Sequence, residues 1–481
     1  MNVHAIEPEP MPTPFTPAPV FDPTQTLRYG REHDWIGHHV ATVLAMIYLF
    51  LLPLATAPKD WAFAILTAWT LIRLPHTWRS YRAFAGMPIL WVTLAWVCWQ
   101  LLSFTWTNDL DQAWDEFKVQ RMLITPLLLW PILDRAPWLV MAALAGVLAQ
   151  NGVQVLQEFG WVATPPAAEG RLRGLIHPIH SAMWFGAAAL WHIGVVMNCR
   201  GWKRWIALAL AAISIVGLFA TGSRGPWIAT AAALIAGAII IPLHRPAMRR
   251  PVAIIAAGAV IAIIVAWTIA PAMIRNRLAD AQQEIAAARQ RQVYWTSAGL
   301  RLGLWGWALE VWRTAPLQGV GAGGFSVAYK QLETFKGAVE TARQRSMIEE
   351  VAGYQEAVAT GRDVTALRGY RRGVRLAEQR YDYLTRDHAH STYLHTLAEQ
   401  GLIGLTLLLT ALAVIARQCW RDRPDHPYSD AMLLVLICWL VGAQFDCYEL
   451  NGHQLGLLTL LAALTLPGRA KVRWQLSAIG D

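Results

Sequence analysis

Long apolar stretches alternate with short polar loops along most of this 481-residue chain. A helix that crosses a bilayer needs about 20 mostly apolar residues, because the hydrocarbon core is about 30 Å thick. Such stretches lie at 39–57, 61–74, 88–104, 122–133, 138–156, 179–197, 205–220, 227–242, 251–270, 393–416, 431–445 and 454–466. The pattern predicts an all-α polytopic membrane protein with about twelve transmembrane helices.

The spacing of these stretches divides the chain into five parts. Residues 1–38 are polar and rich in proline, which predicts a disordered tail. Residues 39–270 hold the first nine predicted spans, and 393–467 hold the last three. Between them, 271–392 is a long amphiphilic region with helical character, and 468–481 forms a second tail.

Basic residues mark one side of the predicted bundle. They follow the second, sixth, eighth, tenth and twelfth stretches, at Arg73, Arg79, Arg82, Arg200, Lys203, Arg204, Arg245, Arg249, Arg250, Arg417, Arg421, Arg423, Arg469, Lys471 and Arg473. Because cytoplasmic loops carry the excess of basic residues, this parity predicts that both termini are cytoplasmic. Arg224, the 271–392 region, the acidic 108–116 stretch, Asp446 and Glu449 then lie on the outer side.

Composition agrees with a membrane protein and excludes other classes. Only 15% of the residues are charged, whereas soluble proteins carry roughly 25%. The net charge of +9 comes with no nucleic-acid recognition motif, so we interpret it as the basic loops of a membrane protein. The five cysteines are scattered without paired spacing and predict neither a disulfide framework nor a metal site.

The outer region contains three recognisable segments. Residues 303–312 place leucine and tryptophan at helical spacing, which predicts a helix lying on the membrane surface and ending before Pro316. The glycine-rich segment 319–324 predicts a flexible turn. The charged segment 336–384 predicts a helical hairpin that breaks near residue 360.

Arginine on the outer side opposes the charge bias, so each such residue is a candidate for function. Arg224 lies between two glycines where an apolar stretch begins. A guanidinium fork beside the free N–H groups of a helix start favours an anion clamp over a snorkelling side chain. Arg301 precedes the 303–312 segment, and Arg171 and Arg173 lie before the sixth stretch. Two or three of these cations would balance a pyrophosphate.

Histidines gather at the start of the tenth stretch, at positions 388, 390 and 395. His390 is the candidate general base, because imidazole takes a proton near neutral pH. His388 is a candidate substrate-binding neighbour, and His180 either lines an acceptor pocket or lies at the membrane interface. A zinc site built from the three clustered histidines remains an alternative, although their spacing matches no usual zinc signature.

A second alternative is a metal-dependent transferase. Asp109 and Asp111 form the DxD pattern that such glycosyltransferases use, but a solvated acidic face is the favoured explanation of these residues. The chain carries no GxxxxGK[ST], GxSxG or HExxH motif. A soluble nucleotide donor therefore has no recognisable binding motif.

Three motifs of the chain resemble motifs of a known protein family. The sequence His390-Ser391, nine residues, then Gly401-Leu402-Ile403-Gly404 is similar to the histidine motif of bacterial O-antigen ligases. The segments TGSRG at 221–225 and Arg301 to Gly321, with its Pro and GxG elements, resemble arginine motifs of the wider O-antigen ligase and polymerase superfamily. Arg171-x-x-Gly174, followed by Pro178, is a looser match to the upstream loop of that superfamily. This chain has Pro178-Ile179-His180 where many members have Pro-Asn.

The resemblance implies a GT-C-like, metal-independent inverting glycosyltransferase of the bacterial inner membrane, with no cofactor. It would transfer a glycan from undecaprenyl pyrophosphate to a sugar hydroxyl of lipid A–core on the periplasmic side, during lipopolysaccharide biosynthesis. By the resemblance, Arg224 and Arg301 hold the pyrophosphate, and His390 acts as base. Arg171, Arg173, His180 and His388 are the further substrate-binding candidates.

Other functions stay open at this point. An O-antigen polymerase or a protein oligosaccharyltransferase of the same superfamily would use the same arginines with another acceptor. A transporter of lipid-linked anions would also use arginines, but its charges would line a path across the bilayer. In this sequence the candidate residues fall on one predicted side, which favours an enzyme.

Overall fold

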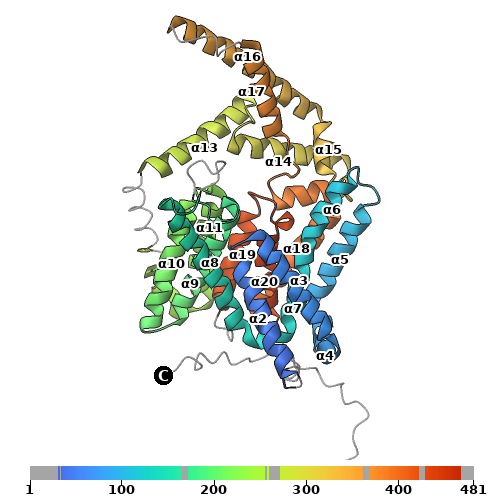
Figure 1. Ribbon diagram of the computed structural model, residues 1–481, viewed down its shortest axis with the longest axis vertical. Coiled ribbons are helices and arrows are strands. Elements are labelled where there is room, and N and C mark those ends of the chain that lie inside the picture. The colour runs from blue at the N-terminus through green and yellow to red at the C-terminus, as the bar shows by residue number, and fades with distance from the viewer. Residues whose placement is uncertain are drawn as a thin grey trace, which may run out of the picture.

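The computed structural model describes residues 31–32, 34–163, 172–254, 257–258, 271–360, 369–421 and 428–466, and every regular element among them is a helix (Figure 1). The elements are α2 (Trp35–Leu51), α3 (Thr56–Ile72), α4 (Leu74–Ala85), α5 (Pro88–Ser103), α6 (Leu110–Val119), η1 (Gln120–Ile124), α7 (Thr125–Leu129), η2 (Trp130–Arg135), α8 (Ala136–Glu158), α9 (Pro178–Asn198), α10 (Trp202–Ala220), α11 (Arg224–His244), η4 (Pro246–Met248), α13 (Pro271–Arg291), α14 (Ser297–Thr314), α15 (Phe325–Lys330), α16 (Glu333–Ala359), α17 (Gly369–Leu384), α18 (Thr392–Arg421), α19 (Ser429–Gly442), η6 (Tyr448–Leu450) and α20 (Gly452–Thr465).

The apolar helices form a bundle, and this confirms the predicted polytopic helical class. Among the described residues, 5 helical stretches are long and apolar enough to cross a membrane, or up to 6 when α4 and α5, bent by 94°, count as one span. Three shorter apolar helices, α2, α19 and α20, also belong to the bundle. The predicted total of about twelve spans stays a prediction, because most of the ninth stretch, 251–270, lies outside the described residues.

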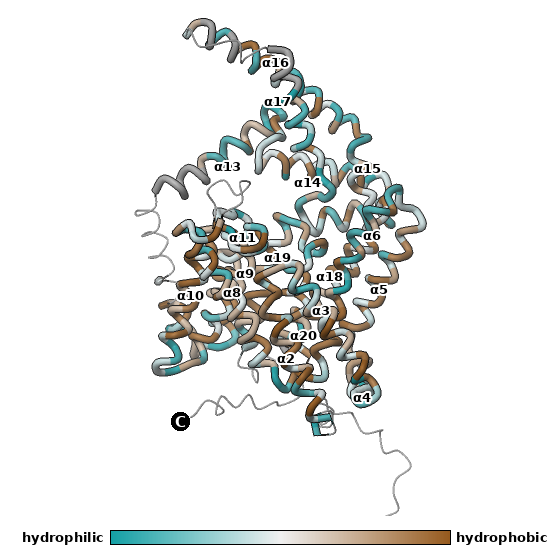
Figure 2. The backbone as a smooth tube through the Cα atoms, in the orientation of Figure 1, coloured by the Kyte–Doolittle hydropathy of each residue, from teal (hydrophilic) through white to brown (hydrophobic). Residues whose placement is uncertain are grey.

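The two ends of the bundle differ in character. Figure 2 shows a largely apolar body, with more hydrophilic helices α13, α16 and α17 above it. The helix α4, which carries Arg79 and Arg82, lies at the opposite, lower end. Of the predicted 1–38 tail, residues 31–32 and 34–38 are described, and α2 begins at Trp35. The rest of that tail and the 468–481 tail lie outside the described residues.

Helices α14, α15 and α16 enclose a second, smaller core above the bundle. Leu304, Trp307 and Val311 of α14 are buried there, together with Phe325 and Tyr329 of α15. This face of α14 is covered by protein, because α15 and α16 return across it. Trp305, Leu309 and Trp312 of the predicted stripe are partly buried or exposed, so the expectation that 303–312 lies on the membrane surface stays a prediction. The end of α14 at Thr314, just before Ala315-Pro316, agrees with the prediction.

The segment predicted as a flexible turn is instead tightly packed. Gly319, Gly321 and Gly323 all have positive φ angles (70°, 92° and 70°), which only glycine adopts readily. The N–H of Gly321 donates to the carbonyl of Glu399 at 2.8 Å, and the N–H of Leu402 donates to the carbonyl of Pro316 at 3.0 Å. These bonds are possible because α18 is broken at Gly401 (φ 64°, ψ −165°). The two glycine motifs thus form one junction that fixes α14 and α15 to α18.

The charged insertion forms the predicted hairpin. Helix α16 ends at Ala359, α17 begins at Gly369, and the two pack against each other above the second core (Figure 1). The Arg380 guanidinium of α17 donates to Ser346 of α16 at 3.0 Å and stacks on the Trp295 ring at 4.5 Å. These contacts connect the hairpin to the segment between α13 and α14.

Candidate active site

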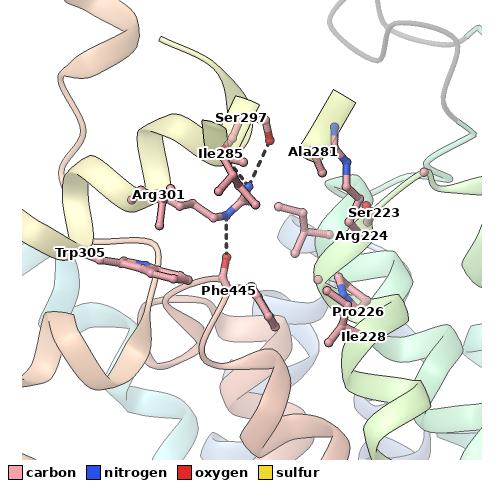
Figure 3. A pocket seen from close by; sticks show the side chains of 15 residues that line it. Ser223, Arg224, Pro226, Ile228, Ala281, Ile285, Ser297, Arg301, Trp305 and Phe445 are labelled. Atoms are coloured by element: carbon pink, nitrogen blue, oxygen red, sulfur yellow. Dashed lines mark hydrogen bonds between the residues drawn. The ribbon is translucent and has the colours of Figure 1, made fainter. Parts of the chain in front are cut away.

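A cavity of about 310 Å³ lies where the bundle meets the upper helices. Its walls come from the start of α11, the helices α13 and α14, and the segment that follows α19. The lining residues are Ile179, Gly222, Ser223, Arg224, Gly225, Pro226, Ile228, Ala281, Ile285, Ser297, Ala298, Arg301, Leu302, Trp305 and Phe445. Figure 3 shows Arg301 on one side of this cavity and Arg224 on the other.

Arg224 occupies the first position of α11, so its side chain and the first backbone N–H groups of that helix face the same cavity. Unpaired N–H groups at a helix start attract anions. The guanidinium contacts the Glu284 carboxylate of α13 at 3.4 Å. Glu284 in turn accepts the N–H of Ala298, at the start of α14, at 2.6 Å. Glu284 therefore links the two arginine-bearing helices and serves as the counter-ion of Arg224.

Arg301 reaches the cavity from the first turns of α14. Its Nε donates to the carbonyl of Phe445 at 3.2 Å, and its NH1 donates to the carbonyl and hydroxyl of Ser297 at 3.0 and 3.1 Å. All three partners are neutral, and within the described part of the chain no ion pair within 4.0 Å involves Arg301. Arg224 is paired with Glu284, and Arg301 has only neutral partners, so the two guanidinium groups give the cavity a net positive charge.

His390 lies beside this cavity and is connected to it through two residues of the lining. The Trp305 indole N–H donates to the His390 carbonyl at 3.4 Å. The His390 Nδ1 is 3.2 Å from the Asp446 carboxylate, and Asp446 directly follows Phe445, which holds Arg301. His390 has φ 50°, a left-handed conformation that is uncommon outside glycine and that often marks functional positions. The arginines and the imidazole thus converge on one region.

Asp446 and His388 set the electrostatics around His390. Burial by itself raises the pKa of Asp446, but the polar surroundings of its carboxylate, with the hydrogen bond to His390 foremost, lower that pKa below the usual range. Burial, helped by His390, lowers the pKa of His388 to about 3, so this ring is neutral. Its Nδ1 accepts the N–H of His390 at 3.3 Å. An ionised Asp446 at Nδ1 leaves the His390 Nε2 as the nitrogen available to accept a proton.

Asp446 is the residue that the sequence analysis missed as part of a site. It appeared only among the outer acidic residues, because 56 positions separate it from His390. Thr392 holds it in place: the Thr392 N–H and hydroxyl donate to the Asp446 carbonyl at 3.2 and 3.1 Å. A carboxylate directly after an apolar stretch, on the same predicted side as the histidines, was the available signal.

The secondary candidates occupy different places. Arg171 lies outside the described residues. The Arg173 carbonyl accepts a hydrogen bond from the Ser181 hydroxyl at 2.6 Å. The Arg173 side chain does not line the cavity. His180 follows the cavity residue Ile179, and its Nε2 lies 2.8 Å from the Asn451 amide nitrogen. His180 is therefore close to the site but directed toward the start of α20.

The clustered histidines separate into two groups. Among the described residues, His388, His390 and Asp446 have potential metal-ligand atoms within 4.8 Å of one another, and so do Glu116, His395 and Glu399. Neither group contains all three histidines, so the predicted three-histidine zinc site does not form. Of the DxD residues, Asp109 caps α6 by accepting the Gln112 N–H at 3.0 Å. That role is structural.

Taken together, the fold and the site define a class: a helical membrane protein with a cationic cavity and a histidine–aspartate pair at one end of its bundle. Comparison with known proteins then identifies a family that the chain resembles. The family model described as O-Antigen ligase matches residues 207–346, which include Arg224, Arg301 and the glycine junction segment. The match confirms, over residues 207–346, the resemblance predicted from the motifs.

A curated relative gives the same family. The chain is 29% identical over 244 residues to a Pseudomonas aeruginosa protein named O-antigen ligase, and the match covers 48% of this chain. The chain spans about 57% of the length of that relative. His390 and Asp446 lie outside the 207–346 match, so their assignment depends on the geometry described above.

Proposed function

We propose that this protein is an O-antigen ligase. It transfers a glycan from undecaprenyl pyrophosphate to a sugar hydroxyl of lipid A–core, with inversion at the anomeric carbon and without a metal. The observation that supports this most directly is the shared cavity of Arg224 and Arg301, two cations from distant segments of which only Arg224 is paired with a carboxylate. A pyrophosphate would replace Glu284 as the partner of Arg224.

The arginines supply electrostatic stabilisation. As the bond between the anomeric carbon and the pyrophosphate oxygen breaks, negative charge accumulates on the leaving group. Arg301 is already oriented by Ser297 and Phe445, and Arg224 by the start of α11. Preorganised donors lose little free energy through reorganisation during the reaction, which is why such groups dominate many rate enhancements.

His390 is the general base in this mechanism. Its Nε2 accepts the proton of the acceptor hydroxyl, the hydroxyl oxygen attacks the anomeric carbon, and undecaprenyl pyrophosphate departs from the opposite face. Asp446 orients the ring and stabilises the imidazolium that forms. His388 is neutral and holds the His390 backbone.

The bacterial inner membrane is the proposed location, with the site on the periplasmic side and both termini in the cytoplasm. The support is the charge pattern: α4 and its arginines lie at the end of the bundle opposite α13 and α14. A glycan donor that arrives as a pyrophosphate is already activated, so the proposed reaction requires no nucleotide.

The test uses purified protein, undecaprenyl-pyrophosphate glycan and lipid A–core in detergent. Arg224→Ala should lower the transfer rate about 100- to 1,000-fold, the usual cost of removing a preorganised transition-state donor. Arg301→Lys should also be harmful, because an ammonium group cannot reproduce the guanidinium fork. The matched control is Arg313→Lys, an exposed position on the same helix, which should keep wild-type activity.

The choice of acceptor separates the ligase from its relatives. Transfer to a second lipid-linked glycan, or to a protein side chain, in place of lipid A–core would identify a polymerase or an oligosaccharyltransferase. Wild-type transfer by Arg224→Ala would contradict the pyrophosphate clamp itself.

A further inference from the structure

A second cavity, of about 470 Å³, lies beside α5 and reaches from Phe117 and Lys118 of α6 to Phe84 of α4. One wall is α5, and the other is formed by α6, η1 and α7. The lining residues are Phe84, Ile89, Leu90, Thr93, Leu94, Val97, Phe117, Lys118, Gln120, Arg121, Leu123, Ile124, Pro126 and Leu127. Its volume falls within the roughly 300–1,000 Å³ of small-molecule sites, and its walls are almost wholly apolar.

The packing order of the helices places this cavity across the site from the first one. Helix α11 packs on α19, α19 on α18, and α18 on α5. Figure 1 shows α11 and α13 on one side of α18 and α5 with α6 on the other. The two cavities therefore lie on opposite sides of α18, and the second also extends toward α4, away from the His390 end of the bundle.

A direct chain of contacts connects the second cavity to the base. Gln120 lines the cavity, and its Nε2 donates to the Glu449 carbonyl at 3.3 Å. Glu449 is three residues from Asp446, the partner of His390. The Gln120 Oε1 accepts the Trp96 indole N–H at 3.3 Å, which holds the amide in this orientation. The inner wall of the cavity is therefore continuous with the loop that positions the base.

The upper mouth of the cavity has the character of a bilayer interface. Phe104, Trp114 and Phe117 form a cluster of edge-to-face rings with centroids 5.2 to 5.9 Å apart. Lys118 and Arg121 lie beside it, with side chains 64% and 42% exposed. Aromatic rings and exposed cations together are typical of the headgroup level of a membrane.

The exposed cations at this mouth can exchange a carboxylate for an anionic headgroup. Lys118 pairs with Asp115 at 2.6 Å, and Arg121 pairs with Asp60 at 3.0 Å. Lys59 also contacts Asp60, at 2.6 Å, but its side chain is only 2% exposed and cannot meet a headgroup. A headgroup phosphate would therefore compete with Asp115 and Asp60 for Lys118 and Arg121. Leu94, on the apolar wall, is 44% exposed and opens the cavity sideways.

We propose that this cavity binds an acyl chain of the phosphorylated glycolipid acceptor, with a headgroup phosphate at Lys118 and Arg121. The inference rests on the proposed function and adds a division of the two lipids: the isoprenoid donor on the arginine side of α18, the acylated acceptor on the α5 side. In this arrangement the hydroxyl would approach the anomeric carbon from one face while the pyrophosphate departs from the opposite face, as a single inverting displacement requires.

Photo-crosslinking of the full chain in nanodiscs of neutral phospholipid tests this directly. The probe is lipid A with a diazirine in one acyl chain, and labelled peptides are located by mass spectrometry. Labelling should fall on α5 and α7. Leu94→Trp should reduce it about tenfold, which is the cost of excluding roughly two methylene groups from an apolar site. The matched control is Leu208→Trp, a similarly exposed leucine on α10, which should label like the wild type.

A second variant keeps the test informative if the tryptophan disturbs folding. Lys118→Glu changes an exposed side chain and leaves the helix packing intact. It should lower labelling by lipid A about fivefold or more, since one basic residue near a membrane surface contributes about that factor. Labelling by a photoreactive diacylglycerol, which has no charge, should stay the same.

Several outcomes would overturn the inference. Equal labelling by photoreactive phosphatidylglycerol would identify a site for bulk lipid, and stronger labelling by photoreactive undecaprenyl phosphate would place the donor there. Kinetics separates this inference from the proposed function. Leu94→Trp should raise the KM for the acceptor and leave kcat and the donor KM unchanged. A wild-type protein that binds lipid A here without transferring glycan would contradict the proposed function alone.

Discussion

Two histidine–carboxylate clusters lie five residues apart on the same segment, and they differ in what surrounds them. The site cluster consists of His388, His390 and Asp446, and the buried cluster consists of Glu116, His395 and Glu399. The His390 side chain is 18% exposed, whereas that of His395 is 2% exposed. Only the first cluster adjoins a cavity with two guanidinium groups.

The partners of the buried carboxylates explain this difference. Glu116 accepts the Gly323 N–H at 3.2 Å, and Glu399 accepts the Phe325 N–H at 3.1 Å. The remaining oxygens of both residues face His395 at 3.7 and 3.5 Å. The buried cluster therefore serves the glycine junction, whereas the site cluster keeps one imidazole nitrogen available. Identical residue types acquire different roles because one group is accessible and the other is sealed.

The largest expected effect is on catalysis by His390. His390→Ala should lower the single-turnover transfer rate at least about 100-fold, because a general base typically contributes 100- to 10,000-fold. The melting temperature in detergent should change little, since the ring borders a cavity. His388→Ala is the control in the same cluster. If that variant were inactive while His390→Ala kept wild-type turnover, the base would be misassigned.

A smaller loss is expected at Asp446. Asp446→Asn keeps the shape of the side chain but removes the charge that stabilises the imidazolium. Turnover should fall about 10- to 100-fold, which is less than the loss of the base itself. Because the two residues act as a unit, combining this change with His390→Ala should cost no more than His390→Ala alone. Fully additive losses in the rate measurements would show that Asp446 acts independently of His390.

Changes in the buried cluster should affect stability before they affect chemistry. His395→Gln leaves two carboxylates sealed in the protein without their cation, which typically costs about 3–5 kcal/mol. The melting temperature should drop clearly, while kcat per folded molecule stays near that of the wild type. A kcat loss as large as that of His390→Ala, at unchanged stability, would contradict the assignment of a structural role to the buried cluster.

The smallest effect is expected from metal removal. The ligand atoms of the site cluster are close enough to hold an ion. Under the proposed mechanism these groups act as base and orienting carboxylate, so excess EDTA should leave the transfer rate unchanged. A loss of activity that Zn²⁺ or Mn²⁺ restores would assign the same residues to a metal centre.

The sequence predicted the features that depend on local pattern. Apolar length indicates which segments span the membrane, and the parity of basic loops places the candidate residues at one end. The motif around Arg224 and the hairpin break near residue 360 are also local, because neighbouring residues determine where a helix begins or ends.

Only the tertiary structure decided the contacts between distant segments. The pairing of His390 with Asp446, the assignment of His395 to a buried cluster, and the covering of α14 by α15 and α16 all join positions far apart in the chain. Hydropathy indicates that one face of a helix is apolar, but it does not indicate whether lipid or protein covers that face. In the same way, a histidine's spacing cannot reveal whether the carboxylate that reaches it belongs to a reaction site or to a sealed junction.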